Sequence, residues 1–218
     1  DSYGFEFASY KNGNLYYAWV LYVLPGSPAA EAGLERGDWI IAVGSETPNV
    51  TNLSAFYSGS ETTFLLADAV RKGNEITFNK KKTISVAASR AVEDTPFLKD
   101  SVYTVGDKKV GYLVYNSFSS GPDDESTIYD DQMKQVFAEF KAENVSEFVL
   151  DLRYNQGGLV TCAQLMTSLL APADALGKTF CIMEHNEKQS KNDEALLLKK
   201  NAEMGNANLD LRRIYVLT

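Results

Sequence analysis

The sequence is poor in the residues that form disulfides and metal sites. Among its 218 residues there are two cysteines, Cys162 and Cys181, and a single histidine, His185. The cysteines do not form a CxxC pair, so neither a disulfide framework nor a zinc site is indicated. We predict two buried free thiols, because unpaired cysteine is among the residues most often found inside proteins. We expect no metal and no cofactor.

Long apolar runs and large basic clusters are also missing. No apolar stretch approaches the ~18 residues that a membrane span needs, and the longest basic run is Lys80-Lys81-Lys82 in a chain of net charge -8. A nucleic-acid surface needs clustered Lys and Arg, so we exclude a nucleic-acid partner and place the three lysines on a solvated strand edge. The acidic residues Asp123-Asp124-Glu125 lack the spacing of a calcium loop. We expect Asp124 or Ser126 to cap the helix that follows.

The pattern of the chain changes between residues 90 and 105. Before this region come short β-rich runs separated by Gly, Pro and Asn turn signals. After it, strand patterns alternate with helical ones, which indicates a parallel sheet with right-handed crossovers. The later strands are expected at 109–116, 148–153 and 213–217, and helices at 128–143, 159–170 and, in EALLLKKNAEM, 194–204. We predict an α+β protein with two domains, residues 1–92 and 93–218.

The first domain contains an informative run, LPGSPAAEAGLERGDWIIAVGS, from Leu24 to Ser45. Pro28 can begin a one-turn helix and Gly33 can end it with a positive φ. Gly37-Asp38 then turns the chain into a strand. This run resembles the most recognisable stretch of PDZ domains, and the resemblance covers about residues 1 to 90.

The PDZ resemblance implies that extended peptides, usually free carboxy termini, bind as an added strand at a sheet edge. It places the carboxylate loop at Ser2-Tyr3-Gly4-Phe5, with Ser2 where Gly is often found. Tyr3, Gly4 and Phe5 are therefore candidate peptide-binding residues. We expect a helix over 62–71 to form the other wall of the groove. Its candidate contacts are Phe64, Leu65 and Ala69, each of which can equally be a core residue.

The second domain contains DLRYNQGG, Asp151 to Gly158, between an apolar strand and a helical pattern. Two glycines before a helix offer unpaired N–H groups without Cβ atoms to obstruct an anion. The phosphate-binding patterns GxxxxGK[ST] and GxGxxG are absent. The anion can instead be the oxyanion of an attacked peptide carbonyl, for which one donor contributes roughly 3 kcal/mol. Alternatively, Gly157 and Gly158 only permit a tight turn.

A PDZ-like domain followed by KVGYLVYNSF, a long helix and DLRYNQGG resembles the carboxy-terminal processing, or tail-specific, protease family. The family pattern is DLR.NPGG, and Gln156 replaces its proline here. The resemblance implies a crotonase/Clp-protease-like α/β core, incomplete at its C-terminus, in a serine endopeptidase with a Ser nucleophile and a Lys base. It implies that Gly157 or Gly158 donates to the oxyanion. The Ser and Lys are expected beyond Thr218.

The same resemblance implies polypeptide substrates, held through their C-termini or unfolded segments. It also implies an extracytoplasmic location, periplasmic or at the cell envelope, of the bacterial type. No signal peptide opens the chain, but an export segment could precede Asp1, since the chain begins directly before a strand pattern. The sequence leaves open whether the protein forms a homo-oligomer and whether it carries a lipid anchor.

Other functions are open on the same residues. One is an inactive scaffold or inhibitor that binds peptides through a protease-like core, and another is a crotonase-type acyl-CoA enzyme, which the PDZ-like domain disfavours. A Ser/His/Asp arrangement would require His185 beside Ser119, Ser120 or Ser168. His185 lies in the charged stretch EHNEKQSKND, which predicts an exposed hairpin or loop.

Overall fold

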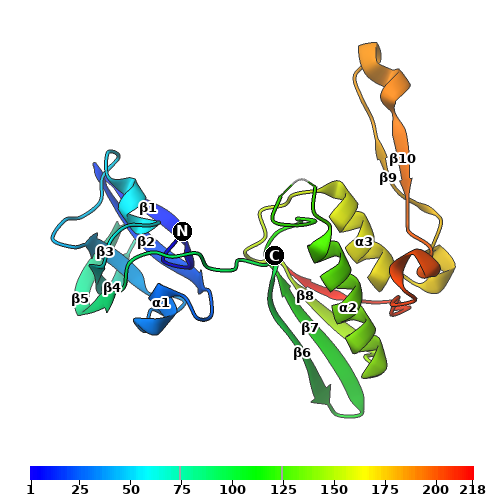
Figure 1. Ribbon diagram of the computed structural model, residues 1–218, viewed down its shortest axis with the longest axis horizontal. Helices are drawn as coiled ribbons and strands as arrows, with labels where there is room; N and C mark the ends of the chain where they lie inside the picture. Colours follow the sequence, from blue (N-terminus) through cyan, green and yellow to red (C-terminus); the bar gives the residue numbers. More distant parts are fainter. Residues whose placement is uncertain (74, 124) are drawn as a thin grey trace. The chain divides into compact units, whose positions relative to one another are not determined.

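The computed structural model describes residues 1–73, 75–123 and 125–218 and divides into two compact units, Asp1–Asp94 and Thr95–Thr218 (Figure 1). Each unit has its own cluster of buried apolar side chains. No helix in the described ranges is long and apolar enough to cross a membrane.

The first unit is a five-stranded antiparallel sheet with strand order β1-β2-β3-β4-β5. A one-turn helix, α1, follows Ser27, whose buried Oγ accepts a hydrogen bond from Ala30 N–H at 3.1 Å. Its elements are β1 (Phe5–Asn12), β2 (Leu15–Val23), α1 (Pro28–Glu31), β3 (Trp39–Val43), the 3₁₀ turn η1 (Leu53–Phe56), β4 (Thr62–Lys72) and β5 (Glu75–Val86).

The helix predicted over 62–71 is wrong, because this segment is strand β4. The core residues Phe64 and Leu66 alternate with half-buried Leu65, which is the period of a strand. β4 pairs along its length with β5, and this pairing decides a segment whose apolar run is ambiguous in isolation. The three lysines from Lys80 lie exposed on β5, the last strand of the sheet.

The second unit has a four-stranded sheet with order β11-β8-β7-β6. β7, β8 and β11 run parallel, as predicted, whereas β6 joins β7 as an antiparallel edge strand. Strand β6 was not predicted, because its polar residues interrupt the strand pattern. The elements are β6 (Phe97–Val105), β7 (Lys108–Tyr115), α2 (Ile128–Ala142), β8 (Glu147–Asp151), α3 (Val160–Leu170), η2 (Ala173–Ala175) and β11 (Tyr215–Leu217).

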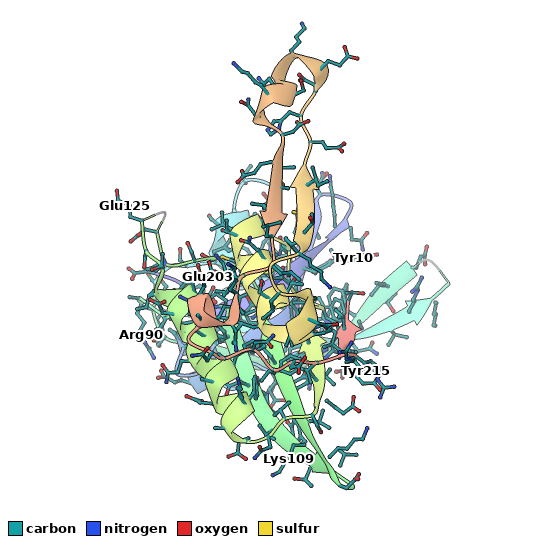
Figure 2. All side chains as sticks on the ribbon, turned by 90° about the vertical axis from the view of Figure 1, so that its right-hand side faces the viewer. Tyr10, Arg90, Lys109, Glu125, Glu203 and Tyr215 are labelled. Atoms are coloured by element: carbon teal, nitrogen blue, oxygen red, sulfur yellow. The ribbon has the colours of Figure 1, made fainter. Side chains whose placement is uncertain are left out.

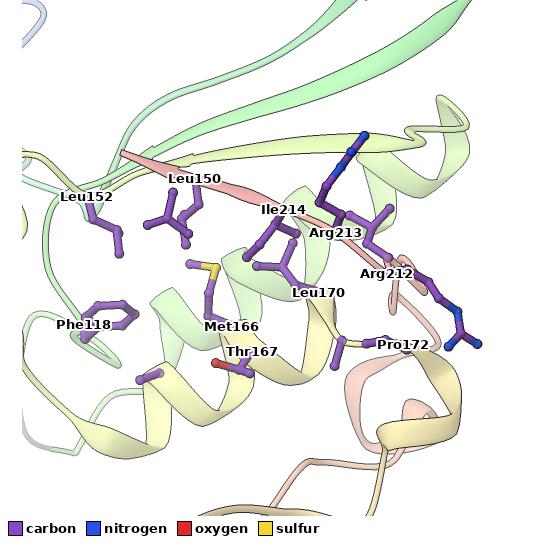
Figure 3. Close-up of a pocket in the computed structure, with 14 residues that line it drawn as sticks. Phe118, Leu150, Leu152, Met166, Thr167, Leu170, Pro172, Arg212, Arg213 and Ile214 are labelled. Carbon is purple, nitrogen blue, oxygen red and sulfur yellow. The ribbon is translucent and has the colours of Figure 1, made fainter. Parts of the chain in front are cut away.

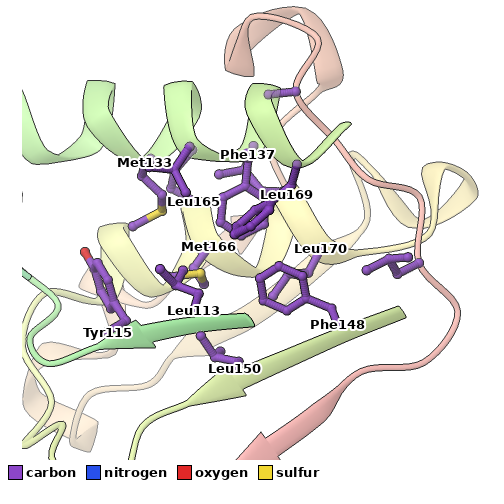
Figure 4. Packing of buried hydrophobic residues seen from close by; sticks show 14 of the residues in the cluster. Leu113, Tyr115, Met133, Phe137, Phe148, Leu150, Leu165, Met166, Leu169 and Leu170 are labelled. Atoms are coloured by element: carbon purple, nitrogen blue, oxygen red, sulfur yellow. The ribbon is translucent and has the colours of Figure 1, made fainter. Parts of the chain in front are cut away.

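Helices α2 and α3 cover one face of this sheet and enclose its core (Figure 4). The rings of Phe137 and Phe140 on α2 lie 5.5 and 5.3 Å from the ring of Phe148 on β8. From α3, Leu165 and Leu169 are almost fully buried in the same cluster. This packing holds α3 against β8, and the candidate site lies in the turn that joins them.

A two-stranded hairpin projects from the second unit (Figures 1 and 2). It consists of β9 (Thr179–Met183), the 3₁₀ turn η3 (Glu187–Asn192) and β10 (Glu194–Leu197), and η4 (Asn201–Met204) follows. The helix predicted for 194–204 is wrong, because 194–197 pair with β9 instead. The prediction of two buried thiols holds for Cys162 but not for Cys181, which is half-buried on β9.

Candidate active site at the glycine turn

The site lies where β8 ends and α3 begins, and its backbone requires glycine. Gly157 and Gly158 have φ values of 100° and 136°, a region that side chains with a Cβ rarely adopt. A bridge joins this turn to the segment after β7. Phe118 N–H donates to Gly157 O at 2.9 Å, and Leu159 N–H donates to Phe118 O at 2.7 Å. A Cβ on Gly158 would lie 2.2 Å from Phe118 O, so only glycine fits.

The two glycine amides differ in whether they are available to a ligand. Gly157 N–H donates to Asn155 Oδ1 at 2.7 Å. Gly158 N–H has no acceptor among the residues that the structure describes, and Gly158 is exposed. Of the two candidate donors predicted from the sequence, the geometry therefore favours Gly158.

A buried carboxylate holds the start of this turn. Asp151 is only 2% exposed and accepts hydrogen bonds from Tyr112 OH at 2.6 Å, from Arg153 Nη2 at 2.6 Å and from Arg153 N–H at 3.2 Å. Asn155 Nδ2 donates to Tyr115 O at 2.9 Å, which ties the turn to β7. The sequence analysis assigned no role to these residues. Their signal was the run of polar side chains directly at a strand end.

We expect the Asp151 carboxylate to make stability depend on pH. Hydrogen bonds from Arg153, followed by that from Tyr112, lower the pKa of Asp151 from 3.8 to about 2. Because the pKa of Asp151 is lower in the folded state than in the unfolded state, its carboxylate stabilises the fold at pH values above the unfolded pKa. This contribution is lost as the pH falls from about 4 to about 2. The shift corresponds to about 2 kcal/mol. Urea unfolding should show wild type more stable than Asp151→Asn near neutral pH, and the difference should shrink across this window. A difference that stays constant with pH would contradict the assignment.

An apolar cavity of about 440 Å³ lies beside the turn in the second unit (Figure 3). Phe118, which bridges to Gly158, is one of its walls, and Leu152 lies at the same end. The other walls come from β8, α3 and the segment around β11: Leu150, Ala163, Met166, Thr167, Leu170, Ala171, Pro172, Leu211, Arg212, Arg213, Ile214 and Val216. The free amide and an apolar binding space are thus connected through one residue.

A thiol near the start of α3 is held in its protonated form. Burial, followed by the hydrogen bond to Asp130, raises the pKa of Cys162 to about 12. Its Sγ donates to Asp130 Oδ1 at 3.3 Å. A thiol is nucleophilic only as the thiolate, so Cys162 is not a nucleophile for this site at neutral pH.

The structure places the first three predicted peptide-binding residues at the start of β1. Tyr3 is buried and its hydroxyl donates to Ser60 O at 2.7 Å. Gly4 is buried with a φ of 81°, and its N–H donates to Ser2 Oγ at 3.0 Å. Phe5 is half-buried and begins β1, which pairs with β2 on one side only within the described part of the sheet. The free edge of β1 is the candidate site for strand addition.

The other three predicted residues do not lie on a helix, since all of them are on strand β4. Phe64 is fully buried, Leu65 is half-buried and Ala69 is exposed. Beside β1 lies η1 instead, with the rings of Phe56 and Tyr57 at 5.2 and 5.0 Å from the ring of Phe7.

Tyr3 N–H donates to Tyr57 O at 3.0 Å, which also joins the residue after η1 to the start of β1. Sequence reasoning missed η1. Its signal was the i, i+3 pair Leu53 and Phe56 within a turn-rich run.

The alternative catalytic groups are not assembled. His185 is exposed on the projecting hairpin, with its Nδ1 3.4 Å from Asp193 Oδ1. Ser168 is buried and donates to Gln164 O at 2.6 Å, and Ser119 donates to Gly121 O at 2.7 Å. No group of three or more His, Cys, Asp or Glu side chains in the described ranges could hold a metal ion. Asp124 lies outside the described residues. The N-cap of α2 is Thr127 and not Ser126, although Ser126 Oγ accepts from Ile128 N–H at 3.4 Å just before the helix.

Residues 109–218 match the model of peptidase family S41, and residues 19–63 match that of the PDZ domain. The chain belongs to peptidase family S41. This confirms the family and the α+β, two-domain fold class predicted from the sequence.

Two known proteins are similar to this chain in sequence. A putative S41 protease from Bacteroides fragilis has 35% identity and a TM-score of 0.77, over 99% of this chain and 56% of that one. A carboxyl-terminal-processing protease from Picosynechococcus sp. is 31% identical over 149 residues, which are 65% of this chain and 32% of that protein.

A photosystem II D1 C-terminal processing protease shares the fold at 21% identity and a TM-score of 0.50, over 78% of this chain and 44% of that one. The chain thus spans about a third to a little over half of these relatives.

Proposed function

We propose that the protein is a serine endopeptidase of the carboxy-terminal processing type. Its substrates would be polypeptides held through their C-termini or unfolded segments, in an extracytoplasmic compartment. The observation that carries this proposal is the Gly158 N–H, exposed and without an acceptor among the described residues, next to an apolar cavity that shares Phe118 with the turn.

In the proposed reaction, a Ser hydroxyl attacks a peptide carbonyl and a Lys, kept neutral by burial, takes up the hydroxyl proton. The carbonyl oxygen becomes negatively charged and accepts a hydrogen bond from Gly158 N–H. Asn155 occupies the neighbouring Gly157 amide and so fixes the direction of the turn. We propose that the Ser and the Lys follow Thr218 in the complete protein.

The PDZ unit would hold the substrate before cleavage. The free edge of β1 can add an extended peptide as a sixth strand through backbone hydrogen bonds. Gly4 N–H is already bonded to Ser2 Oγ, so carboxylate recognition would draw on other groups or on a rotation of the Ser2 side chain.

The full-length protein should cleave an unstructured peptide with a free carboxy terminus more efficiently than the same peptide with an amidated terminus. The reason is that the PDZ unit gains a charged contact only from the free carboxylate. The measurement is kcat/KM for the matched pair of peptides, with the nucleophile Ser→Ala variant as control. Proteolysis that survives in this variant would overturn the proposal. Peptide binding without any cleavage by wild type would favour the inactive scaffold.

A further inference from the structure

The projecting hairpin, residues 178–200, which we call the arm, exposes apolar side chains on a thin two-stranded structure. Ile182, Met183 and Leu197 are 58%, 40% and 48% exposed. β9 pairs only with β10 within the described residues, and an isolated two-stranded hairpin is marginally stable in water. Exposed apolar residues gathered on such an element are a candidate interaction site.

Among the described residues, the arm is anchored to the rest of the second unit by side-chain hydrogen bonds at its base. Gln164 Nε2 on α3 donates to Leu197 O at 2.7 Å, and Lys199 N–H donates to Ser168 Oγ at 2.8 Å. Figures 1 and 2 both show the strands extending away from the helices beyond this base. The apolar middle of the arm is therefore presented in a fixed direction from the second unit.

Charge is distributed unevenly along the arm. The base carries three lysines, Lys178, Lys199 and Lys200, and none of them forms an ion pair with a described residue. The distal half from Glu184 to Glu194 carries four carboxylates against two lysines. From the base outward the order is basic, apolar and then acidic at Glu184, Asp193 and Glu194, beyond which the η3 turn carries Glu187 with Lys188 and Lys191.

This order of charged and apolar residues allows two arms to complement each other when they run in opposite directions. When two arms lie antiparallel about a two-fold axis, the basic base of each faces the acidic half of the other, and the apolar middles meet. The six residue steps from Lys178 to Glu184 span about 20 Å at the rise of a strand, so the axis falls near residues 181 and 182. Such a two-fold contact is the commonest symmetry of protein dimers.

We propose that the arm is a dimerisation element that pairs antiparallel with the arm of a second copy of this chain. Ile182 and Ala195 are paired across the strands and so share one face of the arm, and Leu197 follows on β10 beyond a register shift between Leu196 and Leu197. This face is the apolar centre of the contact. The proposal does not depend on peptidase activity.

The test measures the dimer dissociation constant of the full-length protein by analytical ultracentrifugation. Ile182→Glu should raise this constant at least about tenfold, as expected for a residue at the centre of an interface. Val105→Glu is the matched control, since Val105 is 63% exposed at the end of β6 in the same unit, and it should leave the constant unchanged.

Charge reversal tests the antiparallel direction. Lys199→Glu with Lys200→Glu should weaken the dimer, and adding Glu184→Lys with Glu194→Lys should restore it. These residues are exposed or half-exposed, so the variants should fold, as circular dichroism can verify. A wild-type protein that stays monomeric at about 100 µM would overturn the proposal, because this concentration is far above the dissociation constants of stable complexes. A dimer whose dissociation constant none of the arm substitutions changes would overturn the proposal as well. So would a four-substitution variant that does not recover the dimer affinity lost in Lys199→Glu with Lys200→Glu.

Discussion

Replacing Gly158 by alanine should abolish proteolysis by the full-length protein. The new Cβ would lie 2.2 Å from Phe118 O, so the bridge between the two segments must open and the Gly158 N–H must turn away from its present direction. Loss of one oxyanion donor typically lowers kcat by about 10²–10³. The measurement is kcat with a saturating peptide, beside a thermal unfolding curve that reports whether the protein remains folded.

Gly157→Ala is the matched control for this prediction. A Cβ at Gly157 meets no atom within 4 Å, although the φ of 100° still strains an alanine, at a cost of about 1–3 kcal/mol. Both variants should lose stability, but Gly158→Ala should lose far more activity. Near-normal kcat in Gly158→Ala would show that this amide does not stabilise the transition state.

Replacing Gly4 by alanine should unfold the PDZ unit or bring it close to unfolding. The Cβ would lie 2.1 Å from Ser27 Cβ, and Gly4 has a φ of 81°. Ser27 is fully buried and caps α1, so it cannot move aside. Overpacking costs about 1–3 kcal/mol and the backbone strain a similar amount. We expect a loss of about 3–5 kcal/mol, a large part of the stability of an ordinary domain.

Tryptophan fluorescence can follow this loss in the whole chain. Both tryptophans, Trp19 and Trp39, lie in the first unit with their rings 6.0 Å apart. In urea, Gly4→Ala should shift the fluorescence transition to a much lower midpoint. Gly13 has a φ of 62°, and a Cβ placed there would have no neighbour within 4 Å. Gly13→Ala should therefore lose stability through backbone strain alone. If the two variants unfold at the same midpoint, the close contact with Ser27 is not the cause.

The parts of the fold that the sequence predicted well carry strong local signals. Val136, Phe137 and Phe140 follow the helical period of α2, and all three are buried. The errors fall where pairing with another strand decides the structure. Residues 62–71 and 194–197 have helix-compatible composition but become β4 and β10, because β5 and β9 supply partners for their backbone groups.

The candidate site was predictable only in outline. Two glycines after a strand and before a helix identified the turn, but the sequence could not distinguish their amides. That distinction depends on Asn155 Oδ1, which accepts from Gly157 N–H, and on Phe118, which comes from a distant segment. In the PDZ unit, the positions of Tyr3 and Gly4 at the start of β1 followed from the motif, whereas the role of η1 depends on tertiary contacts with Phe7.

The different surroundings of the two cysteines make the chain selectively reactive toward maleimides. Cys162 is buried, and its raised pKa keeps it a thiol at neutral pH, whereas Cys181 is half-buried on the arm. Alkylation requires an accessible thiolate, so a single fluorophore or spin label should attach to β9 without any mutation. Because the proposed two-fold axis lies near residues 181 and 182, pairing of two arms should slow this labelling.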